Sequence, residues 1–221
     1  ARAAGNGLER TLGDTHVDSM DPRVHKATFG EGGMTDTLDP AEIVFHDLLD
    51  AYAVNPHHDG NPFNVYAKHI ANRQDAQAEM QRALTYAWVN AGERAVVVPS
   101  NHDDMLRRWI VSKDWKTADP ANMAFYLTTA RMMLESTRLT ASGMSCPSPL
   151  ALWAELLTPR LRVLSGDESF QIAGIECGMH GDRGPNGARG SRMNLRRIGV
   201  RSVIGHGHAP GIDEGCYQAG T

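Results

Sequence analysis

The feature that most constrains this chain is the repeated pairing of a short apolar run with metal-ligating residue types. The runs at 42–45, 95–98 and 202–204 are followed by His46-Asp47, Asn101-His102-Asp103 and Gly205-His206-Gly207-His208. Runs of this length and β-branched content are typical of buried strands. In open α/β sheets, ligand sites gather just beyond the carboxyl ends of strands. The pattern therefore predicts a sheet with a polar site along one edge.

The remaining periodicity predicts helices between the strands. Apolar residues at helical spacing indicate helices over 72–91, 104–111, 122–134 and 150–157. Gly92 is well placed to end the first of these, and Pro159 the last. Two further strands are expected over 161–164 and 170–176, joined by a Gly-Asp turn. Helices alternate with strands early and strands dominate later, which indicates an α/β fold.

Length and cysteine usage restrict the class of protein further. A chain of 221 residues fits one domain with a sizeable core, and we expect one catalytic domain over residues 1–221. The three cysteines are widely spaced and include no CxxC pair, which argues against a disulfide framework and a thiolate zinc site. No apolar run is long enough to span a bilayer and no signal peptide is visible. We expect a protein of the cytoplasm with no membrane partner; the oligomeric state stays open.

Charge is distributed unevenly along the chain. The formal net charge is −4, so the molecule as a whole is no general polyanion binder. Between 183 and 201, however, there are six arginines and no acidic residue. A solvated face and an anion-binding surface explain this segment equally well. If it binds anions, Arg183 and Arg189 in the Gly-rich stretch 181–190 are the expected contacts.

Taken singly, the polar segments have ordinary explanations. Asp14-Thr15-His16 fits a surface turn, Asp47 fits a helix N-cap, and Asn101-His102-Asp103 fits a cap or a ligand segment equally well. Taken together, the segments favour a metal site over these ordinary explanations, because nitrogen and carboxylate ligands without thiolates suit manganese, iron or zinc. Seven candidate ligands exceed one tetrahedral site but match two ions that share a carboxylate. The candidates are Asp14, His16, Asp47, Asn101, His180, His206 and His208.

The order of these segments resembles the calcineurin-like metallophosphoesterases. The pattern of that family is D-x-H, G-D-x-x-D, G-N-H-[DE], a lone H, and G-H-x-H. The matching segments are Asp14-Thr15-His16, Asp47-Leu48-Leu49-Asp50, Asn101-His102-Asp103, His180 and Gly205-His206-Gly207-His208. The resemblance covers nearly the whole chain. It departs at two positions that are not ligands, where His46 and Ser100 replace glycines and put the local turn geometry in question.

The resemblance implies a role for each residue. Asp14, His16 and His208 would hold one divalent cation, and Asn101, His180 and His206 the other, with Asp47 bridging them. His102 would assist the leaving oxygen while Asp50 orients it. Two cations about 3.5–4 Å apart, most readily Mn²⁺ with Fe or Zn as alternatives, would supply a hydroxide and clamp the phosphoryl group.

The resemblance also implies a fold, a metallophosphoesterase-type αββα sandwich of two packed mixed sheets flanked by helices. Members of the family continue with further strands after the last G-H-x-H, whereas only residues 211–221 follow here. Two completions of the second sheet stay open. Its missing strands could follow Thr221 in a longer chain, or a partner chain could supply them.

Three functions remain open. The arginine-rich segment favours a nuclease whose substrate and partner is DNA, similar to phage-encoded members of the superfamily, in which case the host cytoplasm is the expected location. A phosphomonoesterase acting on a small molecule or a phosphoprotein would use the same chemistry. A non-enzymatic module that keeps the fold as a scaffold is disfavoured by the complete ligand set. The sequence does not distinguish endonuclease from exonuclease action.

Overall fold

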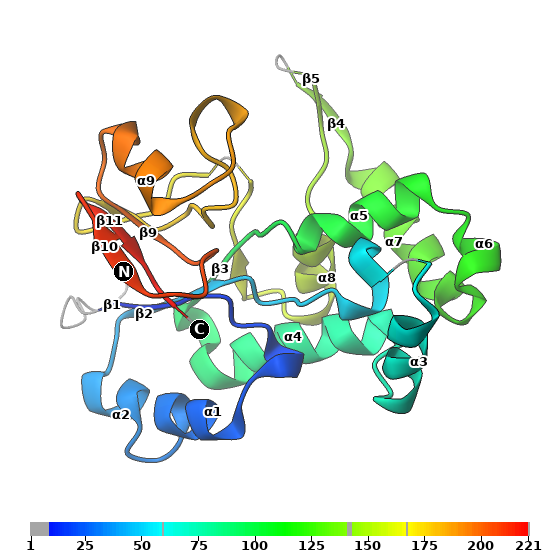
Figure 1. Cartoon of the computed structure of the whole chain (residues 1–221), viewed down its shortest axis with the longest axis horizontal. Helices are drawn as coiled ribbons and strands as arrows, with labels where there is room; N and C mark the ends of the chain where they lie inside the picture. The colour runs from blue at the N-terminus through cyan, green and yellow to red at the C-terminus, as the bar shows by residue number, and fades with distance from the viewer. Residues whose placement is uncertain (1–8, 59, 141–142, 167, 221) are drawn as a thin grey trace.

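The computed structural model describes residues 9–58, 60–140, 143–166 and 168–220, and shows an α/β fold (Figure 1). The strands are β1 (Glu9–Leu12), β2 (Glu42–His46), β3 (Ala95–Val98), β4 (Arg138–Thr140), β5 (Gly143–Ser145), β6 (Arg162–Val163), β7 (Gln171–Ile172), β8 (Ile175–Glu176), β9 (Ser202–Ile204), β10 (Gly211–Asp213) and β11 (Cys216–Gln218). The helices are α1 (Pro22–Phe29), α2 (Met34–Leu38), α3 (Pro62–Ile70), α4 (Ala76–Ala91), α5 (Asp103–Ser112), α6 (Trp115–Ala118), α7 (Met123–Ser136), α8 (Pro149–Leu157) and α9 (Arg192–Leu195).

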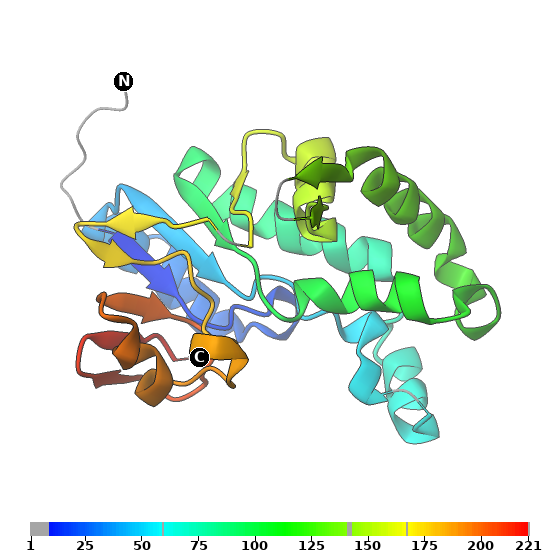
Figure 2. The ribbon, with the colours of Figure 1, turned by 90° about the horizontal axis from the view of Figure 1, so that it is seen from above.

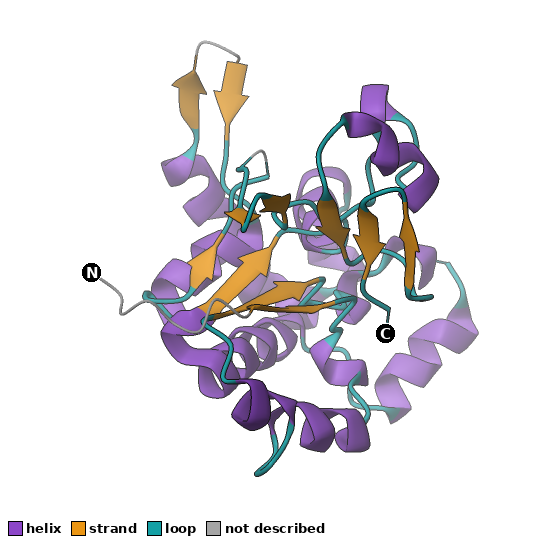
Figure 3. Ribbon diagram, turned by 90° about the vertical axis from the view of Figure 1, so that its left-hand side faces the viewer, coloured by secondary structure: helices purple, strands orange, loops and turns teal. Residues whose placement is uncertain are grey.

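Two sheets form the centre of the molecule (Figure 3). The first has the order β1-β2-β3-β6 and is wholly parallel, so the expectation of two mixed sheets is wrong for this one. The second has the order β10-β11-β9-β8-β7 and is mixed. A separate hairpin of β4 and β5 projects away from both (Figures 1 and 2).

Alternation along the central strands decides which layer each side chain faces. Ile43, Phe45 and Val97 belong to a core shared with α4, α7 and α8. Their neighbours Val44 and Val96 belong to a second core. That core also contains Leu164, which follows β6 of the same sheet, and three residues in or beside β7 and β8 of the other sheet: Phe170, Ile172 and Cys177. Because successive side chains point to opposite faces of a strand, the first sheet lies between a helical layer and the second sheet.

A smaller cluster covers the outer face of the second sheet. Leu195 of α9 packs with Ile204 of β9 and Cys216 of β11. β10 and β11 lie after the last polar motif and form one side of this sheet. Residues 211–218 therefore supply two of its five strands from within the chain. Within the described part of the chain, no helix combines the length and the apolar character needed to cross a bilayer.

Two predicted elements need correction. The helix expected over 72–91 begins at Ala76, because the Asp75 side chain caps it by accepting a hydrogen bond from the Ala78 backbone N–H at 2.8 Å. Its predicted end is confirmed, since Gly92 forms the C-cap with a φ of 57°. The segment 170–176 is a hairpin of two short strands, and β6 before it belongs to the other sheet.

The core between the two sheets should contribute measurably to stability. Val96→Ala removes a side chain that is 1% exposed between the two layers, and should lower the free energy of unfolding by about 2 kcal/mol. Val200→Ala, at a residue that is 47% exposed, should change it by about 0.5 kcal/mol or less. Urea unfolding of both variants measures the difference. Equal losses would contradict the assignment of Val96 to a packed interface.

Candidate metal centre

The loops that follow the central strands are joined to one another by backbone hydrogen bonds. After β1, the N–H groups of Thr15 and His16 donate to the carbonyls of His46 and Asp47 at 3.0 and 2.9 Å. The N–H of Asp14 donates to the carbonyl of Gly205 at 3.2 Å. These bonds extend the pairing past the ends of the strands and connect both sheets. They bring motifs from distant parts of the sequence to one edge, as the sequence predicts.

The Asp47 carboxylate is the centre of the cluster. Its Oδ2 lies 2.8 Å from Nε2 of His16, 3.2 Å from Nδ1 of His102 and 3.8 Å from Nε2 of His180. The side chain is 2% exposed. Burial alone would raise the pKa of this carboxyl, but the close imidazole of His102 and the hydrogen bond from His16 outweigh it and lower the pKa. Asp47 is therefore ionised and surrounded by imidazoles.

Asp14 completes a group that could hold a cation. The candidate ligand atoms of Asp14, His16 and Asp47 all lie within 4.8 Å of one another. Nε2 of His208 lies 3.4 Å from Oδ2 of Asp14, so the expected ligands of the first ion are brought together. Burial, and then the charge of Asp47, raise the pKa of Asp14. A cation between these carboxylates would relieve their repulsion.

His180 and His206 form the other half of the cluster. Nε2 of His180 lies 3.2 Å from Nδ1 of His206, and the ring centroids are 5.1 Å apart. Burial lowers the pKa of His180 to about 4, so its imidazole is neutral near pH 7, as a metal ligand must be. Oδ1 of Asn101 is buried and lacks a hydrogen-bond partner. These three are the expected ligands of the second ion.

The donor set fits the expected cations. Oδ1 of Asp14 and Oδ1 of Asp47 are buried without a hydrogen-bond partner, as is Nδ1 of His180. Buried polar atoms left in this state cost free energy, and a bound cation is one way to satisfy them. The sulfur of Cys177 is no competing ligand, because burial raises the pKa of its thiol to about 12. Nitrogen and oxygen donors without thiolate suit Mn²⁺, Fe or Zn.

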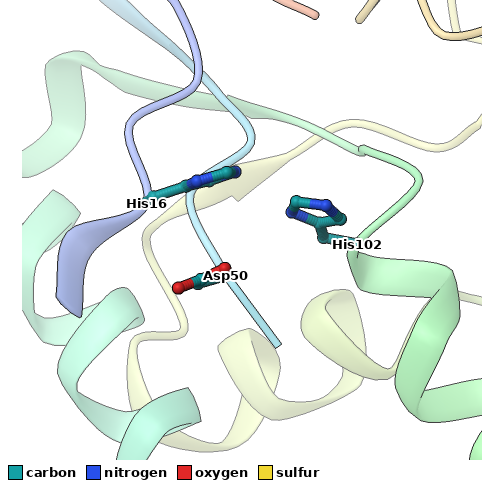
Figure 4. Close-up of side chains that lie close together, drawn as sticks. All are labelled: His16, Asp50 and His102. Atoms are coloured by element: carbon teal, nitrogen blue, oxygen red, sulfur yellow. The ribbon is translucent and has the colours of Figure 1, made fainter. Parts of the chain in front are cut away.

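His16, Asp50 and His102 converge on one space from three different loops (Figure 4). Their candidate ligand atoms lie within 4.8 Å of one another, and the two imidazole centroids are 4.8 Å apart. Oδ2 of Asp50 accepts hydrogen bonds from Nη2 of Arg73 at 2.8 Å and from Oγ of Ser19 at 3.1 Å. Asp50 thus lies beside His102 while Arg73 fixes its carboxylate. Its orienting role toward His102 stays a prediction.

His46, the first departure from the family pattern, is a buried side chain behind the cluster. It is 0% exposed, its ring centroid is 6.0 Å from that of His180, and neither ring nitrogen has a hydrogen-bond partner. Burial, and then the neighbouring His180, lower its pKa to about 3. Gly205 makes room for it, because a Cβ there would lie 2.2 Å from the Cβ of His46.

Ser100, the second departure, lies just before the turn that leads into helix α5. Its Oγ accepts hydrogen bonds from the N–H groups of His102 at 3.1 Å and Asp103 at 3.3 Å. The Asp103 carboxylate accepts in return from the Ser100 N–H at 2.8 Å. This reciprocal pair is a capping box. It fixes the turn that carries Asn101 and His102. The same segment can therefore begin a helix and supply metal ligands, so the two explanations given for it are compatible.

The C-terminal segment positions two ligand loops, a role that the sequence analysis missed. Nε2 of Gln218 donates to the Ala209 carbonyl at 2.6 Å, and a Cβ on Gly207 would lie 1.9 Å from that nitrogen. A Cβ on Gly13 would lie 2.4 Å from the carbonyl oxygen of Ala219. Residues 218–219 therefore pack against the loop of Asp14 and the loop of His206 and His208. No local motif signals this contact.

Arg183 and Arg189 lie in an ordered loop next to the cluster. They pair with each other in an antiparallel bridge, and the Gly190 N–H donates to the Asp182 carbonyl at 2.8 Å. Both arginines are exposed. The predicted loop over 181–190 therefore has a defined shape, with His180 directly before it.

Binding of Mn²⁺ should release protons. Burial lowers the pKa of His16, but its hydrogen bond to Asp47 outweighs this and raises the pKa above the ordinary 6.5. The metal-free His16 therefore holds its proton more tightly than a free imidazole does, and that proton must leave before this imidazole can bind a cation. Calorimetry in two buffers of different ionisation enthalpy should detect this release, with weaker affinity as the pH falls. Binding without proton release at pH 6.5 would contradict His16 as a ligand.

Gln218→Ala should loosen the loop of His206 and His208 without unfolding the chain. We expect the affinity for Mn²⁺ to fall about tenfold, in the range seen when groups that orient metal ligands are removed. Gln171→Ala, at the exposed position of β7, is the matched control and should change it little. Isothermal titration of both variants, with thermal unfolding in EDTA, separates lost ligand positioning from lost stability. Unchanged affinity in Gln218→Ala would refute the positioning role.

The chain has a detectable similarity to a phage protein. No family model matches the sequence, and no solved structure matches it. The chain is similar to protein A1 of Escherichia phage T5, with 30% identity over 234 residues. That match covers 98% of this chain and 40% of protein A1, so the chain spans about two fifths of the length of this relative. The similarity extends over all the loops that form the cluster.

Proposed function

We propose that this chain is a two-metal phosphodiesterase that hydrolyses DNA. One observation carries the proposal: the ionised, buried Asp47 carboxylate lies among His16, His102 and His180, with Asp14 next to it. A carboxylate at the junction of two ligand groups is what a shared bridging position requires. The buried, unpartnered oxygens of Asp14 and Asp47 support the same interpretation.

The fold supports the resemblance to the calcineurin-like metallophosphoesterases. Two face-to-face sheets with helices outside them are the layers that an αββα sandwich of that family requires. The five motifs lie in loops at the end of β1, β2, β3, β8 and β9, in the expected order. The likeness to a phage protein agrees with the expectation of a phage-encoded member acting in the host cytoplasm.

Each half of the cluster would hold one divalent cation, most readily Mn²⁺. Asp14, His16 and His208 would hold one, and Asn101, His180 and His206 the other, with Asp47 between them. The pair of cations would neutralise charge on the phosphoryl group and supply an activated water as the nucleophile. The protein's own contribution is to orient these ligands and to keep the site largely buried.

His102 is the residue that we assign to the leaving group. Its side chain is 19% exposed, whereas that of His180 is 1% exposed, so His102 is the more accessible to a substrate. Its Nδ1 lies 3.2 Å from Oδ2 of Asp47, and the imidazole can donate a proton to the departing oxygen. Asp50, fixed by Arg73, lies on the other side of the same space.

DNA is proposed as the substrate because of the arginine-rich segment. Exposed Arg183 and Arg189 follow His180 closely in sequence and stand on the loop beside the cluster. Guanidinium groups bind phosphate oxygens in pairs, and a polyanion needs several such contacts. A phosphomonoesterase would use a single phosphate contact and remains the alternative that the experiment must separate.

The test is a substrate panel with Mn²⁺. Wild-type protein should cleave labelled DNA and bis(4-nitrophenyl) phosphate, and should release little phosphate from 4-nitrophenyl phosphate. His102→Ala should retain its metal content while turnover falls about 100-fold or more, as expected when a general acid is lost. His69→Ala, whose exposed ring contacts Gln74, is the control and should keep full turnover.

Two results would refute parts of this proposal. Rapid hydrolysis of the monoester without DNA cleavage would identify a phosphomonoesterase. Loss of metal from His102→Ala would mean that His102 is a ligand and that the division between ligands and acid is wrong.

A further inference from the structure

The loop over 181–190 separates two hollows that both reach the candidate metal centre. One has a volume of about 420 Å³ and is lined by residues that include Ser100, Glu168, Glu176, His180, Asp182 and Arg183; we call it the His180 hollow. The other has a volume of about 440 Å³ and is lined by residues that include Arg189, Ser191, Asn194, His206, His208 and Gln218; we call it the His208 hollow. Arg183 and Arg189 are bridge partners, yet each lines a different hollow.

The two hollows differ in charge. Among the described residues that line the His180 hollow, the carboxylates of Glu168, Glu176 and Asp182 outnumber the guanidinium of Arg183, although Glu168 also pairs with Arg162 at 2.9 Å. Among the described residues that line the His208 hollow there is no carboxylate, and Arg189 adds a positive charge to neutral amides and a hydroxyl. A phosphate is therefore repelled from the first hollow and attracted to the second.

The wall of the His208 hollow is held in place by its own hydrogen bonds. Nδ2 of Asn194 donates to the Arg189 carbonyl at 2.8 Å, and Oγ of Ser191 accepts from the Asn194 N–H at 3.2 Å. Across the hollow, Gln218 is fixed to the Ala209 carbonyl. A preformed polar wall loses little conformational entropy when a ligand enters.

We propose that the His208 hollow receives the nucleotide next to the scissile phosphate, and that Arg189 binds the phosphate of that nucleotide. This inference rests on the proposed function. The volume is in the range of small-molecule sites and suits a single nucleotide. A nucleotide of an unpaired strand can enter such a hollow without the cost of unstacking and unpairing a duplex, so the preferred substrate is single-stranded or unwound DNA. A monoester would leave the hollow unused.

The test compares three arginine variants on two substrates. Arg189→Ala should raise KM for a labelled single-stranded 20-mer about tenfold with Mn²⁺, because a charge-assisted phosphate contact is lost. Its kcat/KM for bis(4-nitrophenyl) phosphate should fall much less than its kcat/KM for the 20-mer, since that diester carries no neighbouring phosphate. Arg183→Ala should have a smaller effect than Arg189→Ala. Arg197→Ala is the matched control, because Arg197 is exposed, belongs to the same arginine-rich segment and lines neither hollow.

Binding gives a second readout that does not need turnover. Fluorescence anisotropy of the labelled 20-mer with Mn²⁺, in a His102→Ala background, should show the same order of losses. Arg189→Lys should restore part of the affinity, since it keeps the charge but not the paired geometry. The wild type should also cleave the single strand faster than the same sequence as a blunt duplex.

The outcomes separate this inference from the proposed function. If Arg189→Ala and Arg197→Ala weaken DNA binding equally, the effect is general electrostatics and the hollow is no nucleotide site. If duplex and single strand are cleaved at the same rate, the substrate assignment is wrong. If wild-type protein turns over neither DNA nor the small diester, the proposed function itself fails, and this inference fails with it.

Discussion

The arrangement of the site depends on one buried, ionised carboxylate. Asp47 stands at the end of β2, 2% exposed, with His16, His102 and His180 within 2.8–3.8 Å of its Oδ2. An isolated carboxylate at that depth would be neutral, because burial disfavours charge. Imidazoles from the loops after β1 and β3, those of His16 and His102, keep it ionised. The charge on Asp47 thus requires these two loops to meet at the end of β2, while packing of the second sheet brings His180 to the same carboxylate.

Sheet packing and site geometry share the same residues. His46 ends β2 and fills the space beside Gly205, where β9 leads into the His206 loop. Its ring also lies against His180. At the opposite edge of the cluster, residues 218–219 of the second sheet contact Gly13 and Gly207. If one sheet shifted relative to the other, ligands on both sides of Asp47 would move. The valine side chains packed between the sheets therefore also set the geometry of the site.

Much of this was predictable from local sequence, and the misses have physical causes. The buried strands β2 and β3 are short β-branched runs, and the polar residues at or after their carboxyl ends indicated where the site lies. β1 has the sequence ERTL, which shows no apolar alternation because tertiary pairing with β2 decides its conformation. Helix α1 was missed although Asp21 and Pro22 form a recognisable start. Contacts of Arg73 with Asp50 and of Gln218 with Ala209 join segments with no shared motif, so no spacing rule reveals them.

The backbone strain and the unpartnered buried atoms in this site are better explained by function than by stability. His16 and Asp47 adopt positive φ values of 36° and 50°, although neither is glycine. The same loops contain buried carboxylate oxygens without donors. Each feature costs free energy, and a chain selected for stability alone would replace them with glycine and apolar residues. A pair of bound cations would offset the electrostatic part of that cost. Metal binding and folding are then coupled, because the free energy of binding also stabilises the strained, folded arrangement of the ligands.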